Sequence, residues 1–377
     1  MHGAWQQRPG DRRTSVSDQA GPEDAFGLGR ILIVTDAWYP QINGVVVTLG
    51  HLKRNLEAIG VAVSMLTPAG FRTVPMPSYP AIRLALATPQ AVEVLIAAAL
   101  PAHVHIATEG PLGLLARRYC LRHGLTFTTS YHTRFPEYLR SRLPVPVSWA
   151  YSWLRRFHNA GTGTLVATRS LADELSARGF RDLRLWSRGV DTDLFRPDRR
   201  LPLDLPRPVF LYVGRVAIEK NLPAFLDLDL PGSKVVVGDG PALAMLRARY
   251  PTTTFLGQRS GEDLASIYAS SDVFVFPSRT DTFGIVLLEA LASGLPVAAF
   301  PVTGPADVLA DGKGGVLSED LRAAALAALS VSREEARAKA LAHGWAACAR
   351  LFLAHVRGAH AVLPGTCADA PGCLKPT

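Results

Sequence analysis

The segment between residues 272 and 300 constrains the fold more than any other part of the chain. Asp272-Val-Phe-Val-Phe-Pro277 alternates as a buried strand does, and Leu295-Pro-Val-Ala-Ala-Phe300 has the composition of a second strand. Between them, a Phe283-Gly284 turn precedes an apolar run with the length of a helix. This order indicates two parallel strands joined by a crossover helix, and open α/β sheets bind their ligands at the carboxyl ends of such strands.

Two carboxylates flank the turn in this unit. Asp281 lies in the loop that follows the first strand, and Glu289 lies one turn into the helix. The main-chain amides of Phe283, Gly284 and Ile285 begin that helix, and the free amides of a helix start bind anions. The order of these groups predicts a ligand that presents a sugar hydroxyl, a phosphate and a ribose in succession. The alternative is an ordinary crossover unit with a solvated acid at each end.

A second candidate phosphate site precedes this unit in the chain. Gly214-Arg-Val-Ala-Ile-Glu-Lys-Asn221 follows an apolar strand, and its Arg215 and Lys220 can both face one anion. The planar fork of arginine and the point charge of lysine together suit a diphosphate. Gly238 and Gly240 follow the next strand, where they allow the main chain to approach a nucleotide closely. A tight turn between strand and helix is the alternative reading of these two glycines.

Strands and helices alternate on both sides of a polar, proline-rich segment, which predicts an α/β protein with two doubly wound parallel sheets facing a cleft. The polar segment marks a linker between the two domains. The predicted divisions are a disordered tail at 1–29, an N-terminal domain at 30–190, the linker at 191–207, a C-terminal domain at 208–332, a helix at 333–357 and a disordered tail at 358–377.

Composition limits the class of protein and its location. No run of about 18 residues is free of charges and helix breakers, and the first 29 residues lack an apolar signal core, so we expect a cytosolic chain. Cys120, Cys348, Cys367 and Cys373 show no CxxC spacing and are expected to be free thiols. The net charge of +8 suits an anionic partner such as phosphate, anionic lipid or nucleic acid.

Three polar positions of the N-terminal half are candidates for the cleft. Gly44 lies at a helix start after Asp36-Ala-Trp-Tyr-Pro-Gln-Ile-Asn43, where a phosphate or an acceptor could bind. His132 follows a strand and is expected to face the cleft, although a lone histidine is often structural. Glu109 follows another strand and is a candidate acceptor contact, with a solvated loop acid as the alternative.

A basic and aromatic segment in the same half is a candidate for contact with a membrane. Its composition suits an anionic lipid surface. A nucleic-acid surface is a second reading, but no recognised nucleic-acid module is present, and a core-packed helix with a basic face is a third. The residues proposed to contact the membrane are Arg140, Arg142, Trp149, Trp153, Arg155 and Arg156.

Two Asp-x-Asp pairs could suggest a divalent metal. Asp191 and Asp193 lie in the linker, and Asp227 and Asp229 lie in a leucine-rich segment. Neither pair follows a strand of a nucleotide-binding half. We therefore expect neither a metal nor a cofactor, because cations and helix amides are already placed for a diphosphate.

The Asp281-x7-Glu289 spacing resembles the carboxylate-x7-carboxylate signature of retaining glycosyltransferases of family 4, which have the GT-B fold. The usual family form has glutamate at both ends, whereas this chain has an aspartate first. Arg215 and Lys220 resemble the Arg-x4-Lys diphosphate clamp of the family. The loop before Gly44 resembles its Pro-x-x-Gly-Gly loop, with Asn43-Gly44 in place of Gly-Gly. The resemblance implies that residues 30–190 form the acceptor-side domain and residues 208–332 the nucleotide-sugar-binding domain. It also implies that the helix at 333–357 crosses back onto the N-terminal domain.

The form of the carboxylate motif and the segment Ser130-Tyr-His-Thr-Arg-Phe-Pro-Glu137 look most like the lipid-directed branch of this family. That resemblance implies transfer of a sugar from a nucleotide-diphosphate donor, expected to be UDP-linked, to a lipid such as diacylglycerol at the cytoplasmic membrane surface. It assigns His132 to positioning the donor and Arg215 and Lys220 to the leaving diphosphate. The alternatives are a saccharide or small soluble acceptor, a nucleotide-sugar epimerase, and a non-enzymatic basic binding protein.

Overall fold

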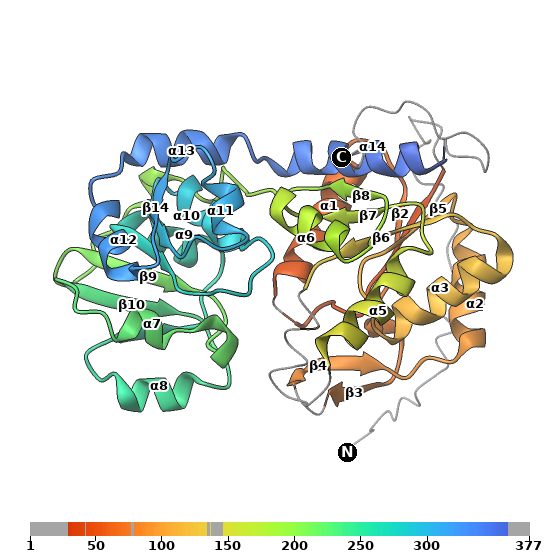
Figure 1. The fold of residues 1–377 in the computed structure, drawn as a ribbon, viewed down its shortest axis with the longest axis horizontal. Helices are drawn as coiled ribbons and strands as arrows, with labels where there is room; N and C mark the ends of the chain where they lie inside the picture. Colours follow the sequence, from red (N-terminus) through yellow and green to blue (C-terminus); the bar gives the residue numbers. More distant parts are fainter. Residues whose placement is uncertain (1–28, 42, 77–78, 134–135, 137–145, 361–377) are drawn as a thin grey trace, which may run out of the picture.

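The computed structural model describes residues 29–41, 43–76, 79–133, 136 and 146–360. These residues form two α/β halves that lie side by side, each built around a six-stranded parallel sheet (Figure 1). The prediction of two doubly wound parallel-sheet domains is therefore confirmed.

The N-terminal sheet has the strand order β2-β1-β5-β6-β7-β8. Its strands are β1 (Ile31–Val34), β2 (Val63–Leu66), β5 (His103–Ile106), β6 (Phe127–Tyr131), β7 (Thr164–Val166) and β8 (Leu183–Leu185). Its helices are α1 (Gly44–Ala58), α2 (Pro89–Ala99), α3 (Pro111–His123), α5 (Val147–His158) and α6 (Arg169–Ala177). Every residue of β1 is buried, as expected for a central strand covered on both faces.

The C-terminal sheet has the order β11-β10-β9-β12-β13-β14. Its strands are β9 (Val209–Val213), β10 (Ser233–Val237), β11 (Thr254–Gly257), β12 (Val273–Phe276), β13 (Val297–Ala299) and β14 (Gly315–Leu317). Its helices are α7 (Pro223–Leu226), α8 (Leu243–Arg249), α9 (Gly261–Ser270), α10 (Ile285–Ala292), α11 (Pro305–Val308) and α12 (Leu321–Ala328), with the 3-10 turns η2 (Pro197–Arg199) and η3 (Ile218–Lys220).

Residues 67–100 contain elements that the sequence patterns did not predict. A 3-10 turn, η1 (Pro68–Gly70), is followed by an antiparallel hairpin of β3 (Thr73–Met76) and β4 (Tyr79–Ala85), and then by α2. The hairpin forms a separate two-stranded sheet below the N-terminal half in Figure 1. The sequence pattern does not predict this hairpin, because each of its short strands contains a proline, at positions 75 and 80, and proline is unfavourable within a strand.

The end of the chain differs from the single helix predicted over 333–357. Two helices are present, α13 (Arg333–Leu341) on the C-terminal half and α14 (Trp345–His360) on the N-terminal half (Figure 1). The helical hydrogen bonding is interrupted between α13 and α14, where the His343 carbonyl accepts the main-chain amide of Val190. Val190 lies just before the linker and forms an isolated parallel bridge with Gly344. α14 packs against α1 and buries Phe352 in the same core as Trp186. The last helix thus ties the two halves together.

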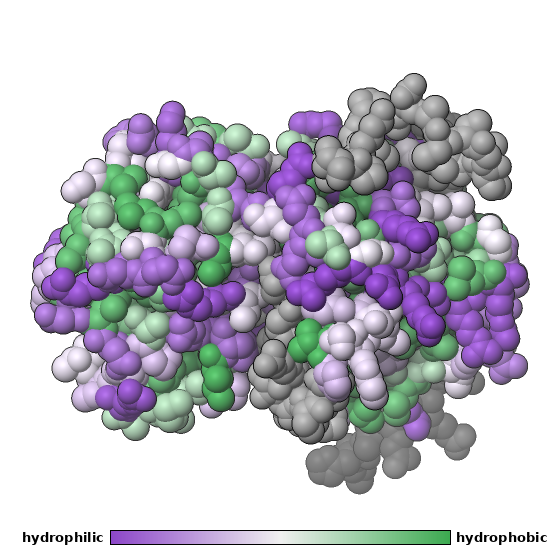
Figure 2. All heavy atoms as spheres, viewed as in Figure 1, coloured by the Kyte–Doolittle hydropathy of each residue, from purple (hydrophilic) through white to green (hydrophobic). Residues whose placement is uncertain are grey.

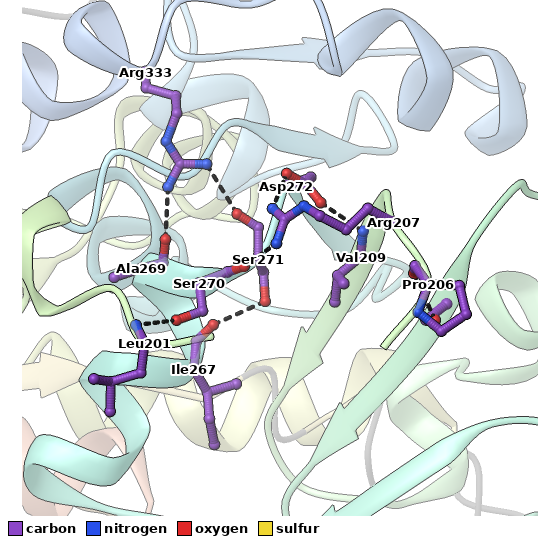
Figure 3. Close-up of polar contacts among 11 residues, drawn as sticks. Leu201, Pro206, Arg207, Val209, Ile267, Ala269, Ser270, Ser271, Asp272 and Arg333 are labelled. Atoms are coloured by element: carbon purple, nitrogen blue, oxygen red, sulfur yellow. Dashed lines mark hydrogen bonds and ion pairs between the residues drawn. The ribbon is translucent and has the colours of Figure 1, made fainter. Parts of the chain in front are cut away.

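The linker is fixed to the C-terminal half by polar contacts at the end of α9 (Figure 3). The Arg333 guanidinium donates to the carbonyls of Ala269 and Ser271, both at 2.9 Å. The Leu201 amide donates to the Ser270 hydroxyl at 2.9 Å. Arg333 therefore satisfies carbonyls that the end of α9 leaves unpaired and anchors the start of α13.

No helix in the described part of the chain is both long and apolar enough to cross a lipid bilayer. Cys120 and Cys348 are buried free thiols, as predicted, and the two remaining cysteines lie outside the described residues.

Candidate active site

Sheet topology brings the predicted phosphate-binding loops together. β9 lies between β10 and β12, so the loops after these three strands are neighbours at one edge of the sheet. The strand order reverses between β9 and β12, and crevices at such switch points are the usual ligand sites of open α/β sheets. Arg215 and Lys220 follow β9, and Asp281 follows β12.

Lys220 and Asp281 form an ion pair across this switch point. The Lys220 ammonium lies 2.5 Å from Oδ1 of Asp281, and both side chains are largely buried. Asn221 supports the arrangement by donating to the Pro277 carbonyl at 3.1 Å. Burial is the largest influence on Asp281 and opposes its ionisation, but the charge and hydrogen bond of Lys220, the Ser278 hydroxyl and the Arg215 charge together outweigh it, so the pKa of this carboxyl lies below its usual value. Oδ2 of Asp281 is buried and has no partner of ordinary hydrogen-bond geometry among the described residues, and the nearby Ser278 hydroxyl helps to lower the pKa of the carboxyl. Oδ2 is therefore a candidate acceptor for a ligand.

Arg215 also has an acidic neighbour in its own loop. Its Nη1 lies 3.6 Å from Oε1 of Glu219, and its carbonyl accepts the hydroxyl of Tyr212 at 2.9 Å. The sequence analysis did not assign Glu219, although its position four residues after the arginine is a regular spacing for an ion pair. The structure therefore places both predicted cations in the loop after β9, each beside a carboxylate.

The start of α10 meets the predicted description of an anion site. Gly284 has a left-handed conformation, with φ of 82°, and no side chain caps the helix. Phe283 is buried beneath the turn and Ile285 is the first helical residue. The amides at this end are therefore directed to the cleft without a capping side chain, in an eight-residue helix whose dipole favours negative charge.

The two domains meet at this loop. Thr282 Oγ1 donates to the main-chain carbonyl of His132 at 2.8 Å, which joins the Asp281 loop to the end of β6. Gly44, the first residue of α1, faces Ile285, because a Cβ added to Gly44 would lie 3.7 Å from the Ile285 side chain. Asn43 caps α1 by accepting the amides of Val45 and Val46, so the start of α1 is already partly satisfied.

His132 is held by a residue that the sequence analysis did not identify. Nη2 of Arg188 lies 2.9 Å from Nδ1 of His132, while Nε2 of the histidine is buried and has no partner among the described residues. Burial and then the Arg188 charge hold the pKa of His132 well below its usual value. The histidine is therefore neutral, and its unpartnered nitrogen is a candidate contact for a ligand.

Glu289 lies one turn into α10, as predicted, but in a different environment from Asp281. It accepts the Tyr268 hydroxyl at 3.0 Å, and burial raises its pKa to about 7. It lines an interdomain cavity of about 190 Å³ with α1, α14 and residues that lead into the linker. His51 also lines this cavity and stacks on Trp345 at a centroid distance of 4.5 Å.

The two glycines after β10 have a packing role that their sequence pattern did not indicate. Both have positive φ, and an added Cβ would lie 1.9 Å from the Gly214 carbonyl at Gly238 and 2.4 Å from the Val216 carbonyl at Gly240. The close approach that they allow is thus to the neighbouring loop of the protein. These contacts fit the tight-turn reading of the two glycines, and their approach to a nucleotide stays a prediction.

Glu109 is part of a buried network in the N-terminal domain. Its carboxylate lies 3.1 Å from Nε2 of His158, whose Nδ1 contacts the Thr129 hydroxyl at 2.8 Å. Asp36 occupies the start of α3, where it accepts the amides of Leu112 and Gly113. The contact of Glu109 with an acceptor stays a prediction, and one carboxylate oxygen already has a partner.

Four of the six residues predicted to contact a membrane lie in the part of the chain that the structure describes. Trp149 and Trp153 of α5 are 72% and 42% exposed, which is high for aromatic side chains in a folded domain. Arg155 and Arg156 are also exposed on this helix, and Arg155 donates to the Arg178 carbonyl at 3.1 Å. Arg140 and Arg142 lie outside the described residues.

The described part of the chain offers no ready-made metal site. None of its groups of histidine, cysteine, aspartate and glutamate brings three or more such side chains together in a way that could hold an ion. Asp191 instead accepts the amides of Asp193 and Leu194 as a local cap.

Comparison with known proteins identifies the family. The family model described as Glycosyltransferase Family 4 matches residues 42–194, and the model described as Glycosyl transferases group 1 matches residues 207–332. A GDP-mannose-dependent alpha-mannosyltransferase of Mycobacterium tuberculosis is 33% identical over 316 residues, which cover 76% of this chain and 83% of the relative. The chain belongs to glycosyltransferase family 4. It is an enzyme that transfers sugar from a nucleotide-linked donor.

Other relatives of this glycosyltransferase differ in their named reactions. Sulfoquinovosyl transferase SQD2 of Arabidopsis thaliana is 32% identical and covers 65% of this chain and 52% of the relative. An alpha-monoglucosyldiacylglycerol synthase of Streptococcus pneumoniae is 27% identical and covers 72% of this chain and 70% of the relative. Among solved structures, the sucrose-phosphate synthase of Thermosynechococcus elongatus is similar with a TM-score of 0.71, 22% identity and coverage of 88% of this chain and 99% of the other. That similarity confirms the GT-B fold.

Proposed function

We propose that this glycosyltransferase moves a hexose from a nucleoside-diphosphate donor to a membrane lipid with retention of anomeric configuration. The observation that carries the proposal is the contact between Thr282 and His132, because it brings the loop of Asp281 and the first-domain histidine to one cleft. The predicted donor is UDP-linked, and the GDP-mannose dependence named for the Mycobacterium tuberculosis relative makes GDP-mannose the second donor to test.

In this mechanism, the cations and the helix start act on the leaving group. Arg215, Lys220 and the amides at the start of α10 stabilise the diphosphate as the bond between the sugar C1 and the phosphate oxygen breaks. Oδ2 of Asp281 accepts a hydrogen bond from a sugar hydroxyl. The acceptor oxygen bonds to C1 on the face that the phosphate leaves, and its proton passes to a phosphate oxygen. The proposal requires no metal and no covalent bond between sugar and enzyme.

Two observations support a lipid acceptor. The Streptococcus pneumoniae relative is named for making a glucosylated diacylglycerol lipid. In this chain, α5 exposes Trp149 and Trp153 beside arginines, and Figure 2 shows hydrophilic residues mixed with small hydrophobic groups on the face that carries α5 and α3. Exposed tryptophans beside basic side chains suit the boundary of an anionic bilayer.

The reaction is tested with labelled UDP-glucose and GDP-mannose in separate assays, each with diacylglycerol vesicles, a soluble saccharide or no acceptor. We expect a labelled lipid with the α-anomeric configuration of its donor, and loss of product in Asp281→Asn. Product only with the saccharide would contradict the lipid acceptor, and interconversion of the donor without an acceptor would indicate an epimerase. An inverted product would contradict the proposed stereochemistry.

Membrane contact gives a separate prediction. Replacing Trp149 and Trp153 with alanine is expected to weaken binding to vesicles of anionic lipid by about tenfold, because each indole contributes apolar area at the lipid boundary. Met245→Ala, which removes a similarly exposed apolar side chain from α8, is the control. Co-sedimentation with vesicles measures the binding. Equal binding of the double variant and the control would contradict a membrane role for α5.

A further inference from the structure

Arg188 is a buried cation that is held from several sides. Its residue is 4% exposed, Nη1 donates to the Trp186 carbonyl at 2.8 Å, and the guanidinium lies 4.6 Å from the centroid of the Trp186 ring. Trp186 is itself fully buried and donates its indole N–H to the Cys348 carbonyl of α14 at 3.1 Å. Burial lowers the pKa of Arg188 to about 10, so the guanidinium is charged at neutral pH.

The contact between Arg188 and His132 determines where the histidine carries its proton. A guanidinium has only donors, so Nδ1 of His132, 2.9 Å from Nη2 of Arg188, accepts the hydrogen bond. In the neutral imidazole the proton is then on Nε2. A second proton would have to occupy Nδ1, directly facing the guanidinium charge. His132 is therefore restricted to one neutral tautomer.

The proton on Nε2 has no acceptor in the described protein, although the atom is buried. Buried polar groups are nearly always paired, so an unpartnered N–H at a cleft is a candidate ligand contact. The His132 carbonyl accepts Thr282, which is next to Asp281, so the ring belongs to the same cleft as the proposed donor site.

We propose that Arg188 is a positioning residue that holds His132 as a neutral Nε2–H donor toward the sugar or diphosphate of the donor substrate. The catalytic part of this inference rests on the proposed function, whereas the tautomer does not. Because Nδ1 is occupied and Nε2 carries the proton, His132 has no free lone pair and cannot act as a general base.

The surroundings of His132 contain other titratable groups. The groups that face it are Arg188, His105 of β5 and His158 of α5. Burial lowers the pKa of His105 to about 3, so this neighbour is neutral across the range in which a histidine usually titrates. Arg188 is thus the charged group whose removal is expected to alter the state of His132.

The test uses nitrogen-15 NMR of the His132 ring in the donor-free full chain, together with steady-state kinetics. In the unaltered enzyme we expect a protonated Nε2, an unprotonated Nδ1 and no titration between pH 5 and 9. Arg188→Met is expected to release the ring, so that it exchanges tautomers or titrates. This variant is also expected to lower kcat by about tenfold or more, with a smaller change in donor KM. Arg188→Lys, which keeps a charged donor, is expected to recover part of both properties.

Arg184→Met is the matched control, because Arg184 also bonds to main-chain carbonyls, those of Thr162 and His355, but does not contact His132. It should leave the His132 nitrogen signals unchanged. A proton on Nδ1 in the unaltered enzyme, or titration of His132 near pH 6.5, would overturn the inference whatever the substrate is. Unchanged NMR signals in a folded Arg188→Met variant would also overturn it. A correct tautomer with no loss of kcat in that variant would remove the catalytic part alone.

Discussion

Replacing Lys220 with alanine is expected to lower kcat by about 100- to 1,000-fold. The estimate follows from the usual cost of removing one preorganised donor from a developing negative charge. In the proposed mechanism that charge is on the leaving diphosphate, beside Lys220 at the switch point of the C-terminal sheet. Turnover of the labelled donor under saturating conditions measures the effect. A variant that retains more than half of the activity would contradict the diphosphate clamp.

Lys313→Ala is the matched control for the loss of one positive charge in the same domain. Lys313 is exposed and lies two residues before β14, at the amino end of a strand of the parallel sheet. The proposed site is at the carboxyl ends of these strands, on the opposite edge. We therefore expect Lys313→Ala to leave kcat within about twofold of the unaltered enzyme.

The same substitution has a second, pH-dependent effect through Asp281. The pKa of this carboxyl is lowered in the folded enzyme because Lys220, Ser278 and Arg215 together outweigh the effect of burial. The ionised carboxylate therefore contributes stability above the ordinary pKa of aspartate, about 4, and Lys220 supplies a large part of that contribution. That contribution is lost as the pH falls through the lowered pKa of the folded state. Lys220→Ala should therefore destabilise the protein more at pH 7 than at pH 3, and adding Asp281→Asn should recover part of the loss.

The architecture could be predicted because central parallel strands are covered on both faces. Segments such as Ile31–Val34 and Val209–Val213 are therefore continuous apolar runs. Such a run is recognisable in the sequence without knowledge of the strands that pair with it. The hairpin of β3 and β4 could not be found in this way, because it lies outside the main sheets and contains prolines. The break between α13 and α14 was missed because it depends on a main-chain bond to Val190, far away in the sequence.

The candidate site was predicted where its residues lie in one loop or in adjacent crossover units. The spacing of Arg215 and Lys220 and the position of Asp281 were enough to expect them together, since the strands that precede them are neighbours. Arg188 and Tyr268 were missed because their partners, His132 and Glu289, are 56 and 21 residues away. Only tertiary packing decides which nitrogen or carboxylate such residues contact.

Glu289→Gln is expected to stabilise the protein at pH 8 and to weaken donor binding. The pKa of Glu289 is raised to about 7 from an ordinary value of 4.5, because burial disfavours its charge. The folded state therefore binds more protons than the unfolded state between these values, and stability falls as the pH rises from about 4.5 to 7. Glutamine keeps an acceptor for the Tyr268 hydroxyl and removes this loss.

The expected gain is at most about 3 kcal/mol at pH 8 and disappears near pH 4, where glutamate is protonated in both states. Thermal unfolding of the unaltered protein and of Glu289→Gln at intervals between pH 4 and 8 measures the gain. A difference in stability between the two proteins that stays constant across this range would contradict the raised pKa. Glu262→Gln, the same substitution at an exposed acid of α9, is the control for the change of side chain.

The expected loss of donor affinity in Glu289→Gln follows from the removal of the negative charge of Glu289. If Glu289 accepts hydroxyls of the donor ribose, its ionised form binds them more strongly than its protonated form, since hydrogen bonds to charged acceptors are the stronger ones. Nucleotide affinity of the unaltered enzyme should then rise as the pH increases through about 7, and Glu289→Gln should bind about tenfold more weakly at pH 8 with little pH dependence. Calorimetric titration with UDP and with GDP at pH 6 and pH 8 measures both effects. Affinity that does not change with pH, together with full affinity in the variant, would show that this carboxylate only supports α10 against Tyr268 and does not contact the donor.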